Sequence, residues 1–309
     1  MLSTFLQSLP FFALIGLGYG AARTGFFPQS ATDHLTRFVF YFALSAMLFG
    51  FAANLSLGEI VSGEFILAYL LASLAVWALV VTVALVRRRP AAEALVEAQC
   101  GVVGNTGFLG VPLLVALLGP AAIGPVMMVL AIDLAVFSSL FTVLLTLTRE
   151  GRATIGLLGA VVMGVLRNPM IVSMGLGLGW SALALPLPVP AAEFLSVLGA
   201  AATPCALFAI GASLAGRSTE RLAVAAWLSS AKLVLHPAAV AVAALVIFPV
   251  EPAAALVMVV AAALPVAGNV FILAQHYGTA PQRVSTAILV SHVAAVATLP
   301  LVIALLQGG

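Results

Sequence analysis

Long apolar runs are the feature that most constrains how this chain can fold. They recur along the whole sequence at lengths of about 18 to 25 residues, which is enough to cross a bilayer as a helix. We expect ten such spans, at roughly 4–22, 34–53, 64–86, 96–118, 123–147, 168–186, 191–215, 221–247, 253–275 and 284–306. Because 63% of the 309 residues are hydrophobic and only 7% are charged, a soluble core is excluded. The predicted fold class is an all-α polytopic membrane protein.

Basic residues indicate how these spans are oriented. Eleven of the twelve Lys and Arg residues fall in alternate loops, and loops rich in these residues stay on the cytoplasmic side of a membrane. They are Arg23, Arg37, Arg87, Arg88, Arg89, Arg149, Arg152, Arg167, Arg217, Arg221 and Arg283. We therefore expect a multi-pass protein of the cell membrane, the bacterial inner or plasma membrane, with both termini extracytoplasmic.

A sequence match at a fixed offset indicates an internal repeat. The run Gly16–Gly20, with glycine at every second position, returns 159 residues later (175 − 16) as Gly175–Gly179. We expect these glycines to allow close helix packing. Five spans per half is an odd number, so the second half enters the membrane from the opposite side. The predicted architecture is an inverted repeat of five plus five helices, residues 1–150 and 151–309, with Ala153–Leu166 as an interfacial helix between them.

The fourth and ninth spans are each interrupted near the centre. The interruptions read GNTGFLGVP at 104–112 and LPVAGN at 264–269. Glycine and proline open a helix there and free backbone N–H and C=O groups, which hydrocarbon cannot satisfy unless protein, water or a ligand does. Breaks at corresponding positions of two halves point to a transport site.

Each interruption also carries an asparagine, Asn105 or Asn269, and an unpaired buried amide costs about 1 to 3 kcal/mol. One interpretation is that each asparagine caps the broken helix of the other repeat. The other is that the half-helix N-termini and the amides bind an anion, and both roles can coexist. The expected substrate-binding residues are Asn105, Thr106, Gly107, Gly268 and Asn269, and the helix-break positions are Gly104, Pro112 and Pro265.

Four titratable residues lie inside the spans, and we expect them to form an ion pair or to take part in coupling. Asp133 and Lys232 are the only formal charges deep in the apolar runs. An isolated ion at that depth costs about 2.5 to 3.5 kcal/mol or more, so pairing of the two is expected. The alternative is that one of them changes charge state with substrate or with a coupling proton. His236 and His292 titrate near physiological pH and are either hydrogen-bond partners or proton-coupling groups.

Other polar residues have simpler interpretations. Glu93 and Glu97 are expected to compensate the dipole at the start of the fourth span. Cys100 and Cys205 lie in apolar segments and match no ligand spacing, so no metal and no cofactor are expected. No His-Glu-x-x-His motif, activated nucleophile or acid cluster indicates an enzyme.

The two interruptions occur together with Arg167-Asn168-Pro169 before the sixth span and with PCALFAIG at 204–211 in the seventh. In combination, over essentially the whole chain, these motifs resemble the auxin efflux carrier family. Its best-known members are the PIN-formed plant auxin carriers, and its bacterial members are permeases often linked to malate, malonate or other organic anions. One departure is Ser45, which stands where the family often has proline.

The resemblance implies a fold akin to the bile-acid transporter and sodium/proton antiporter group. Spans one, two, six and seven would form a scaffold, and spans three to five with eight to ten a mobile core that includes Asp133 and Lys232. Spans four and nine would cross at Pro112 and Pro265, with a carboxylate substrate nearby.

We therefore expect a secondary transporter, a permease or efflux carrier, of small organic anions such as dicarboxylates or auxin-like carboxylates, working by an elevator movement. The alternatives are a sodium- or proton-coupled exchanger of the same fold and a membrane sensor that does not transport. The expected partners are the anion, a coupling proton or sodium ion, the lipid bilayer and, as an open alternative to a monomer, a second copy in a homodimer, but no nucleic acid.

Overall fold

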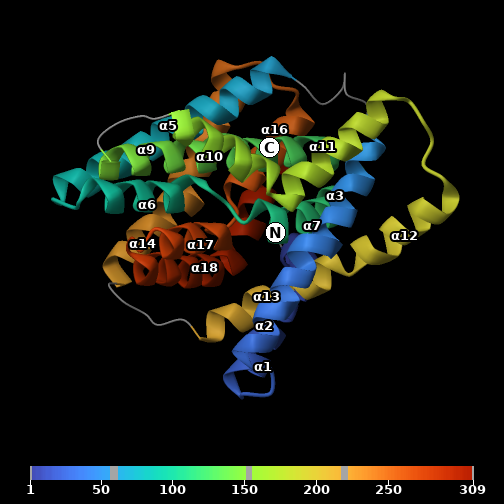
Figure 1. The fold of residues 1–309 in the computed structure, drawn as a ribbon, viewed down its shortest axis with the longest axis horizontal. Helices are drawn as coiled ribbons and strands as arrows, with labels where there is room; N and C mark the ends of the chain where they lie inside the picture. Colours follow the sequence, from blue (N-terminus) through green and yellow to red (C-terminus); the bar gives the residue numbers. More distant parts are fainter. Residues whose placement is uncertain (1, 56–61, 151–154, 217–221, 308–309) are drawn as a thin grey trace.

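The computed structural model describes residues 2–55, 62–150, 155–216 and 222–307, and these residues form helices and no strand (Figure 1). The predicted all-α class is therefore confirmed for this part of the chain. Six helical stretches in it are long and apolar enough to cross a membrane, namely Gln29–Ala53, Gly63–Val86, Pro120–Thr148, Val189–Ala215, Leu222–Ile247 and Pro281–Gln307. Shorter apolar helices cover Leu9–Arg23, Thr106–Leu118 and Pro252–Ala262.

The helices follow one another in two long series, in which short π-helical or 3-10 turns (η) interrupt several of them. The first series is α1 (Leu2–Arg23), α2 (Gln29–Phe38), η1 (Val39–Ala43), α3 (Leu44–Ala53), α5 (Gly63–Val86), α6 (Ala91–Val102), η2 (Thr106–Gly110), α7 (Val111–Leu118), η3 (Pro120–Ala122), α8 (Ile123–Ile132), η4 (Asp133–Phe137) and α9 (Ser138–Glu150). The second is α10 (Ile155–Leu166), α11 (Pro169–Ala182), α12 (Val189–Ala200), α13 (Ala202–Ala215), α14 (Leu222–Ser230), η5 (Ala231–Leu235), α15 (His236–Val242), η6 (Ala243–Ile247), α16 (Pro252–Ala262), α17 (Gly268–His276) and α18 (Pro281–Gln307).

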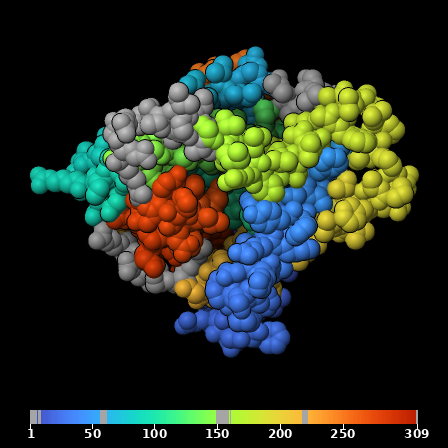
Figure 2. All heavy atoms as spheres, viewed as in Figure 1, coloured from blue at the N-terminus to red at the C-terminus, as the bar shows by residue number. Residues whose placement is uncertain are grey.

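One group of helices, which we call the glycine-packed group, consists of α1–α3 and α11–α13. α1 lies along α13, and α3 lies against α11 and α12. Figures 1 and 2 show these blue and yellow segments together on one side of the molecule. A Cβ atom at Gly18 would lie 2.1 Å from the carbonyl oxygen of Phe208, and one at Gly177 would lie 2.6 Å from the Cβ of Ala52. The central glycine of each repeated run therefore allows close helix packing, as predicted.

The remaining long helices, α5–α9 and α14–α18, form a second group, which we call the crossing group. α5 packs on α6 and α15, and α14 packs on α18. Figure 1 shows α14, α17 and α18 beside α6 on the side away from α12. Both interrupted stretches belong to this group, and their interruptions are buried.

The interruptions themselves are short pieces of non-helical chain. α6 ends at Val102 and η2 begins at Thr106, whereas α16 ends at Ala262 and α17 begins at Gly268. Pro265 lies in the second gap, as expected for a helix break. Pro112 does not lie in the first gap but in the opening turn of α7. Because η2 runs directly into α7, Pro112 lies inside the continuous helical stretch Thr106–Leu118 rather than at a free helix start.

Candidate functional site

The two interruptions meet in an antiparallel backbone pairing that we call the crossing, formed by residues 103–105 and 265–267. Gly104 lies opposite Val266. The N–H of Asn105 donates to the carbonyl oxygen of Pro265 at 2.8 Å, and the N–H of Ala267 donates to that of Val103 at 3.1 Å. Each break thus satisfies backbone groups that the other has freed, which is the condition for unwound chain inside an apolar protein. The predicted crossover is centred on Gly104 and Val266 rather than on Pro112.

Asn105 is the N-cap residue of η2, but its side chain does not cap that turn. Its Nδ2 atom lies 3.2 Å from Nε2 of His292, a residue 187 positions away on α18. The other ring nitrogen of His292, Nδ1, lies 2.8 Å from the carbonyl oxygen of Ile288. Both side chains are buried, with 5% of Asn105 and 4% of His292 exposed. The fold therefore joins two residues that sequence analysis had treated separately.

Asn269 lies in the first turn of α17, directly after the crossing. Its buried Oδ1 atom has no hydrogen-bond partner among the described residues. The preceding N-cap residue, Ala267, provides no side-chain cap, so the positive end of the α17 dipole is left without one. A Cβ atom added to Gly268 would meet no atom within 4 Å, so open space borders this helix start. An unused buried acceptor beside open space marks a place for water or a ligand.

Gly107 and Phe108, in η2, face the glycine-packed group. A Cβ at Gly107 would lie 2.3 Å from the terminal methyl carbon of Met170 on α11. The ring of Phe108 stacks on Phe40 of η1, with centroids 6.2 Å apart and planes 3° from parallel. The first break therefore lies where the two groups of helices touch.

Asp133 opens the π turn η4 and supports the first break. Its Oδ1 atom accepts from the hydroxyl of Tyr69 at 2.9 Å, and its Oδ2 atom accepts from the hydroxyl of Thr106 at 3.3 Å. The same Thr106 hydroxyl lies 3.4 Å from the carbonyl oxygen of Gly104. The carboxylate is thus tied to the residue that follows Asn105.

Lys232, in the π turn η5, supports the second break. Its Nζ donates to the carbonyl oxygen of Ala262, the last residue of α16, and lies 3.1 Å from Nδ1 of His236. A cation at this position suits the negative end of a helix dipole. Gly104 lies against this side chain, because a Cβ there would be 3.3 Å from both Nζ and Cε of Lys232.

The predicted direct ion pair is not formed, since among the described residues no nitrogen–oxygen contact within 4 Å joins Lys232 to Asp133. Each charge instead stabilises one end of the crossing, and the two attract each other through space. Side chains of α5 connect them. Nε2 of His236 lies 2.8 Å from the hydroxyl of Ser73, which interacts with Tyr69 one turn away on α5.

A chain of neighbouring polar side chains therefore runs from Lys232 through His236, Ser73 and Tyr69 to Asp133. Lys232 has donors only, so Nδ1 of His236 accepts and its Nε2 carries the proton toward Ser73. Sequence analysis missed Tyr69 and Ser73. The sequence pattern that could have identified them is a pair of hydroxyl side chains four residues apart, and so on one face, within a long apolar stretch.

Comparison with known proteins identifies the class to which this arrangement belongs. The sequence model of a family described as "Membrane transport protein" matches residues 4–303. The chain belongs to this family.

A relative from Rhizobium meliloti (strain 1021), named "Putative malonate transporter", is 33% identical over 307 residues, which cover 97% of this chain and 95% of the relative. Membership of the membrane transport protein family confirms the predicted resemblance to auxin efflux carriers. The protein is therefore a membrane transporter.

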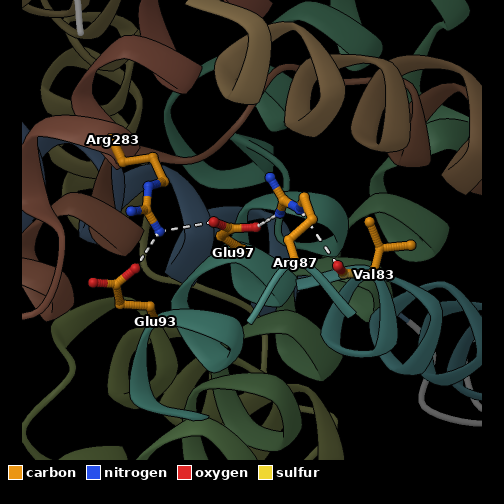
Figure 3. A network of polar contacts seen from close by, with 5 residues as sticks. All are labelled: Val83, Arg87, Glu93, Glu97 and Arg283. Atoms are coloured by element: carbon orange, nitrogen blue, oxygen red, sulfur yellow. Dashed lines mark hydrogen bonds and ion pairs between the residues drawn. The ribbon is translucent and has the colours of Figure 1, made fainter. Parts of the chain in front are cut away.

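A second polar cluster in this chain lies apart from the crossing. It changes the interpretation of Glu93 and Glu97, which were expected to compensate a helix dipole. Figure 3 shows the carboxylate of Glu97 between the guanidinium groups of Arg87 and Arg283. One nitrogen of Arg283 lies 2.7 Å from Glu97 and 2.8 Å from Glu93. The two acids thus pair with arginines rather than only with the helix dipole. Since Glu97 is fully buried, its charge needs these partners.

Proposed function

We propose that this transporter carries small organic anions, such as dicarboxylates or auxin-like carboxylates, and binds them between Asn105 and Asn269 beside the crossing. The observation that carries the proposal is the meeting of two broken helices at one buried backbone pairing. The uncapped start of α17 supplies N–H groups and a positive dipole end for a carboxylate. The open space at Gly268 lies at the same helix start, beside the amide of Asn269, whose NH2 group is the part that a carboxylate would contact.

The substrate to test first is malonate. The name of the Rhizobium meliloti relative refers to it, and this chain matches that relative along nearly its whole length. Malonate carries two carboxylates, and each of the two broken helices offers one asparagine amide at or beside the crossing. Each amide can donate two hydrogen bonds, which is the chemistry that a carboxylate accepts.

The membrane arrangement belongs to the same proposal: ten spans as an inverted repeat of residues 1–150 and 151–309, with both termini extracytoplasmic. The reciprocal backbone bonds of the crossing support two related halves. Arg87 and Arg283 both pair with Glu97, which supports placing these two basic residues on the same side of the membrane. Three of the arginines on which the orientation rests, Arg152, Arg217 and Arg221, lie outside the described residues.

Alternating access proceeds in this proposal by an elevator movement of the crossing group along the glycine-packed group. The contact of Asn105 with His292 and the ion pair of Glu97 with Arg283 both join α18 to the first half, which favours movement as one body. The contacts of Gly107 and Phe108 put the first break at the boundary between the groups. A substrate beside it would be exposed to either side as the boundary shifts.

A sodium- or proton-coupled exchanger of the same fold is the second candidate. The chain that links Lys232 to Asp133 favours it, because a proton or cation gained there would change the charge balance at both breaks. The two candidates differ in the direction in which an ion moves, because in an exchanger the sodium ion or proton crosses the membrane opposite to the anion. Anion flux that requires such an opposed ion movement supports the second candidate, and anion flux without it supports the first.

Two measurements test the proposal. In detergent, the melting temperature of the purified protein is followed with malonate, malate, succinate and indole-3-acetate. At a concentration about 100 times Kd, a true ligand adds about 2.7 kcal/mol to the free energy of unfolding. In proteoliposomes, the stabilising anion should exchange with its labelled form. A non-transporting sensor would bind without exchange, and a protein that neither binds nor exchanges any of these acids contradicts the proposal.

A further inference from the structure

His292 and Asn105 form a hydrogen bond whose direction is set by chemistry. Nδ1 of His292 faces the carbonyl oxygen of Ile288 at 2.8 Å, and a carbonyl only accepts, so Nδ1 carries a proton in every charge state. In the neutral ring Nε2 is then the acceptor. It faces the Nδ2 donor of Asn105 at 3.2 Å, which is the partner that a neutral ring needs.

Protonation of His292 reverses this demand. The proton enters on Nε2, which becomes a donor and can no longer accept from the amide nitrogen of Asn105. A half-turn of the amide about its terminal torsion brings Oδ1 to the ring instead, at little steric cost because the two amide atoms have similar size. The amide NH2 group then occupies the position that Oδ1 held before.

The amide that is turned in this way is the one proposed to receive the substrate. With a neutral His292, the amide atom not engaged by the ring is an acceptor, which repels a carboxylate. With a charged His292, it is a donor with two N–H groups, which binds one. A buried imidazolium without an anion is also costly, and a bound anion removes much of that cost.

We propose that His292 is the binding site for a co-transported proton, and that Asn105 transmits its charge state to the anion. This inference rests on the proposed function, because it assigns the proton to the same site. By reciprocity, a proton that favours the anion is itself favoured by the anion, so the two bind together. The expected activity is symport of an organic anion with a proton.

Other titratable groups around α18 are already engaged or exposed, except Cys100, which is a buried free thiol. Lys232 of η5 bonds to His236 and to the end of α16, and Asp133 bonds to Tyr69 and Thr106. The charges of Lys232 and Asp133 are opposite, so their effects on a proton at His292 oppose each other. The remaining groups on the helices packed against α18, or on α18 itself, are Glu93, Glu97 and Cys100 on α6, Arg283 on α18, Tyr19 and Arg23 on α1, and His276 on α17.

Titration calorimetry with malonate tests the inference on the unmodified protein. The heat of binding is measured in buffers of different ionisation enthalpy at pH values above about 6.5, where carboxylates are ionised. Binding should take up about one proton per anion, and Kd should rise about tenfold per pH unit once His292 is neutral in the free protein. Malonate binding without proton uptake overturns the inference and leaves the proposed function intact. Failure of every tested anion to bind overturns both.

Two variants locate the proton. His292→Gln cannot charge, so proton uptake should fall from about one to about zero, and Kd should lose its pH dependence. His276→Gln is the matched control, because His276 is exposed on the neighbouring helix α17, and it should keep the proton. Equal proton uptake by wild type and His292→Gln would place the proton elsewhere and contradict the assignment. Should His292→Gln fail to fold, the wild-type stoichiometry still decides whether a proton accompanies the anion.

Discussion

The backbone and the side chain of Asn105 serve different partners. Its N–H completes the crossing by donating to Pro265, and its amide contacts His292. Because the backbone bond does not depend on the side chain, a change of side chain should affect ligand binding more than the crossing itself.

Replacement of Asn105 or Asn269 by alanine should therefore weaken anion binding. The loss of one hydrogen bond to a charged partner costs about 1.5 to 3 kcal/mol, which is roughly tenfold to more than a hundredfold in Kd. Kd and the unliganded melting temperature are measured for each variant. Asn54→Ala, which replaces an exposed asparagine directly after α3, is the control and should bind normally. Normal affinity with a collapsed melting temperature would show that the two amides are structural.

Tyr69 offers a second residue-scale prediction, because its hydroxyl is the closest donor to the buried carboxylate of Asp133. Tyr69→Phe should lower the free energy of unfolding by about 1 to 3 kcal/mol, since it leaves one carboxylate oxygen short of a donor. Thermal or denaturant unfolding in detergent measures the change. Tyr41→Phe removes a hydroxyl from a side chain that is 55% exposed and should change stability little. Equal effects of the two replacements would contradict the role given to Tyr69.

Elements of two kinds position the site. π turns carry Asp133 and Lys232, and such turns widen a helix locally and are frequent at functional sites. Glycines set the distance between whole helices in the other group. At Gly211 of α13, a Cβ would lie only 1.8 Å from the carbonyl oxygen of Ile15 on α1, so these two helices touch through their backbones.

The run Gly16–Gly20 on α1 allows this packing to be tested with a control from the same helix. Gly18→Ala would put a methyl group 2.1 Å from the backbone of Phe208, so α1 must move away from α13. A cost of about 1 to 3 kcal/mol or more is expected. Gly16→Ala meets no atom within 4 Å and should be neutral or slightly stabilising. Melting temperatures of the two variants measure the difference, and a larger loss in Gly16→Ala would refute the packing.

At the scale of the whole molecule, the two groups of helices differ in what holds them. Backbone contacts at glycine join α1 to α13, whereas hydrogen bonds and ion pairs join the crossing group. The crossing and the Arg87–Glu97–Arg283 cluster lie within the crossing group, and the rings of Phe40 and Phe108 meet at the boundary. An apolar boundary allows sliding, because it breaks no directional bond.

The proposed orientation predicts which loops a membrane-impermeant maleimide can reach in spheroplasts. In a Cys205→Ala background, Ala184→Cys should be labelled in intact spheroplasts, and Arg88→Cys only after permeabilisation. Both positions are exposed, and the native Cys100 is buried. The opposite labelling pattern would show that the orientation in the membrane is the reverse of the one proposed. Labelling of both in intact spheroplasts would contradict the odd number of membrane crossings that the proposed arrangement puts between the two positions.

The sequence by itself determined the all-helical membrane class, the family and the places of the two breaks. These depend on local properties, namely the length of apolar runs and the effect of glycine and proline on a helix. It also indicated the glycine-mediated packing, because a residue without a side chain lets another helix approach closely wherever the helix lies.

Only the tertiary structure decided which side chains meet. Asn105 contacts His292 across 187 residues, and His236 reaches Ser73 across 163. The same structure separated Asp133 from Lys232 by bonding each to a different broken helix, and it placed Pro112 inside α7 rather than in the crossing. The physical reason is that a buried charge takes the nearest partner that also satisfies freed backbone groups. Those partners come from helices distant in sequence, so no local pattern specifies them.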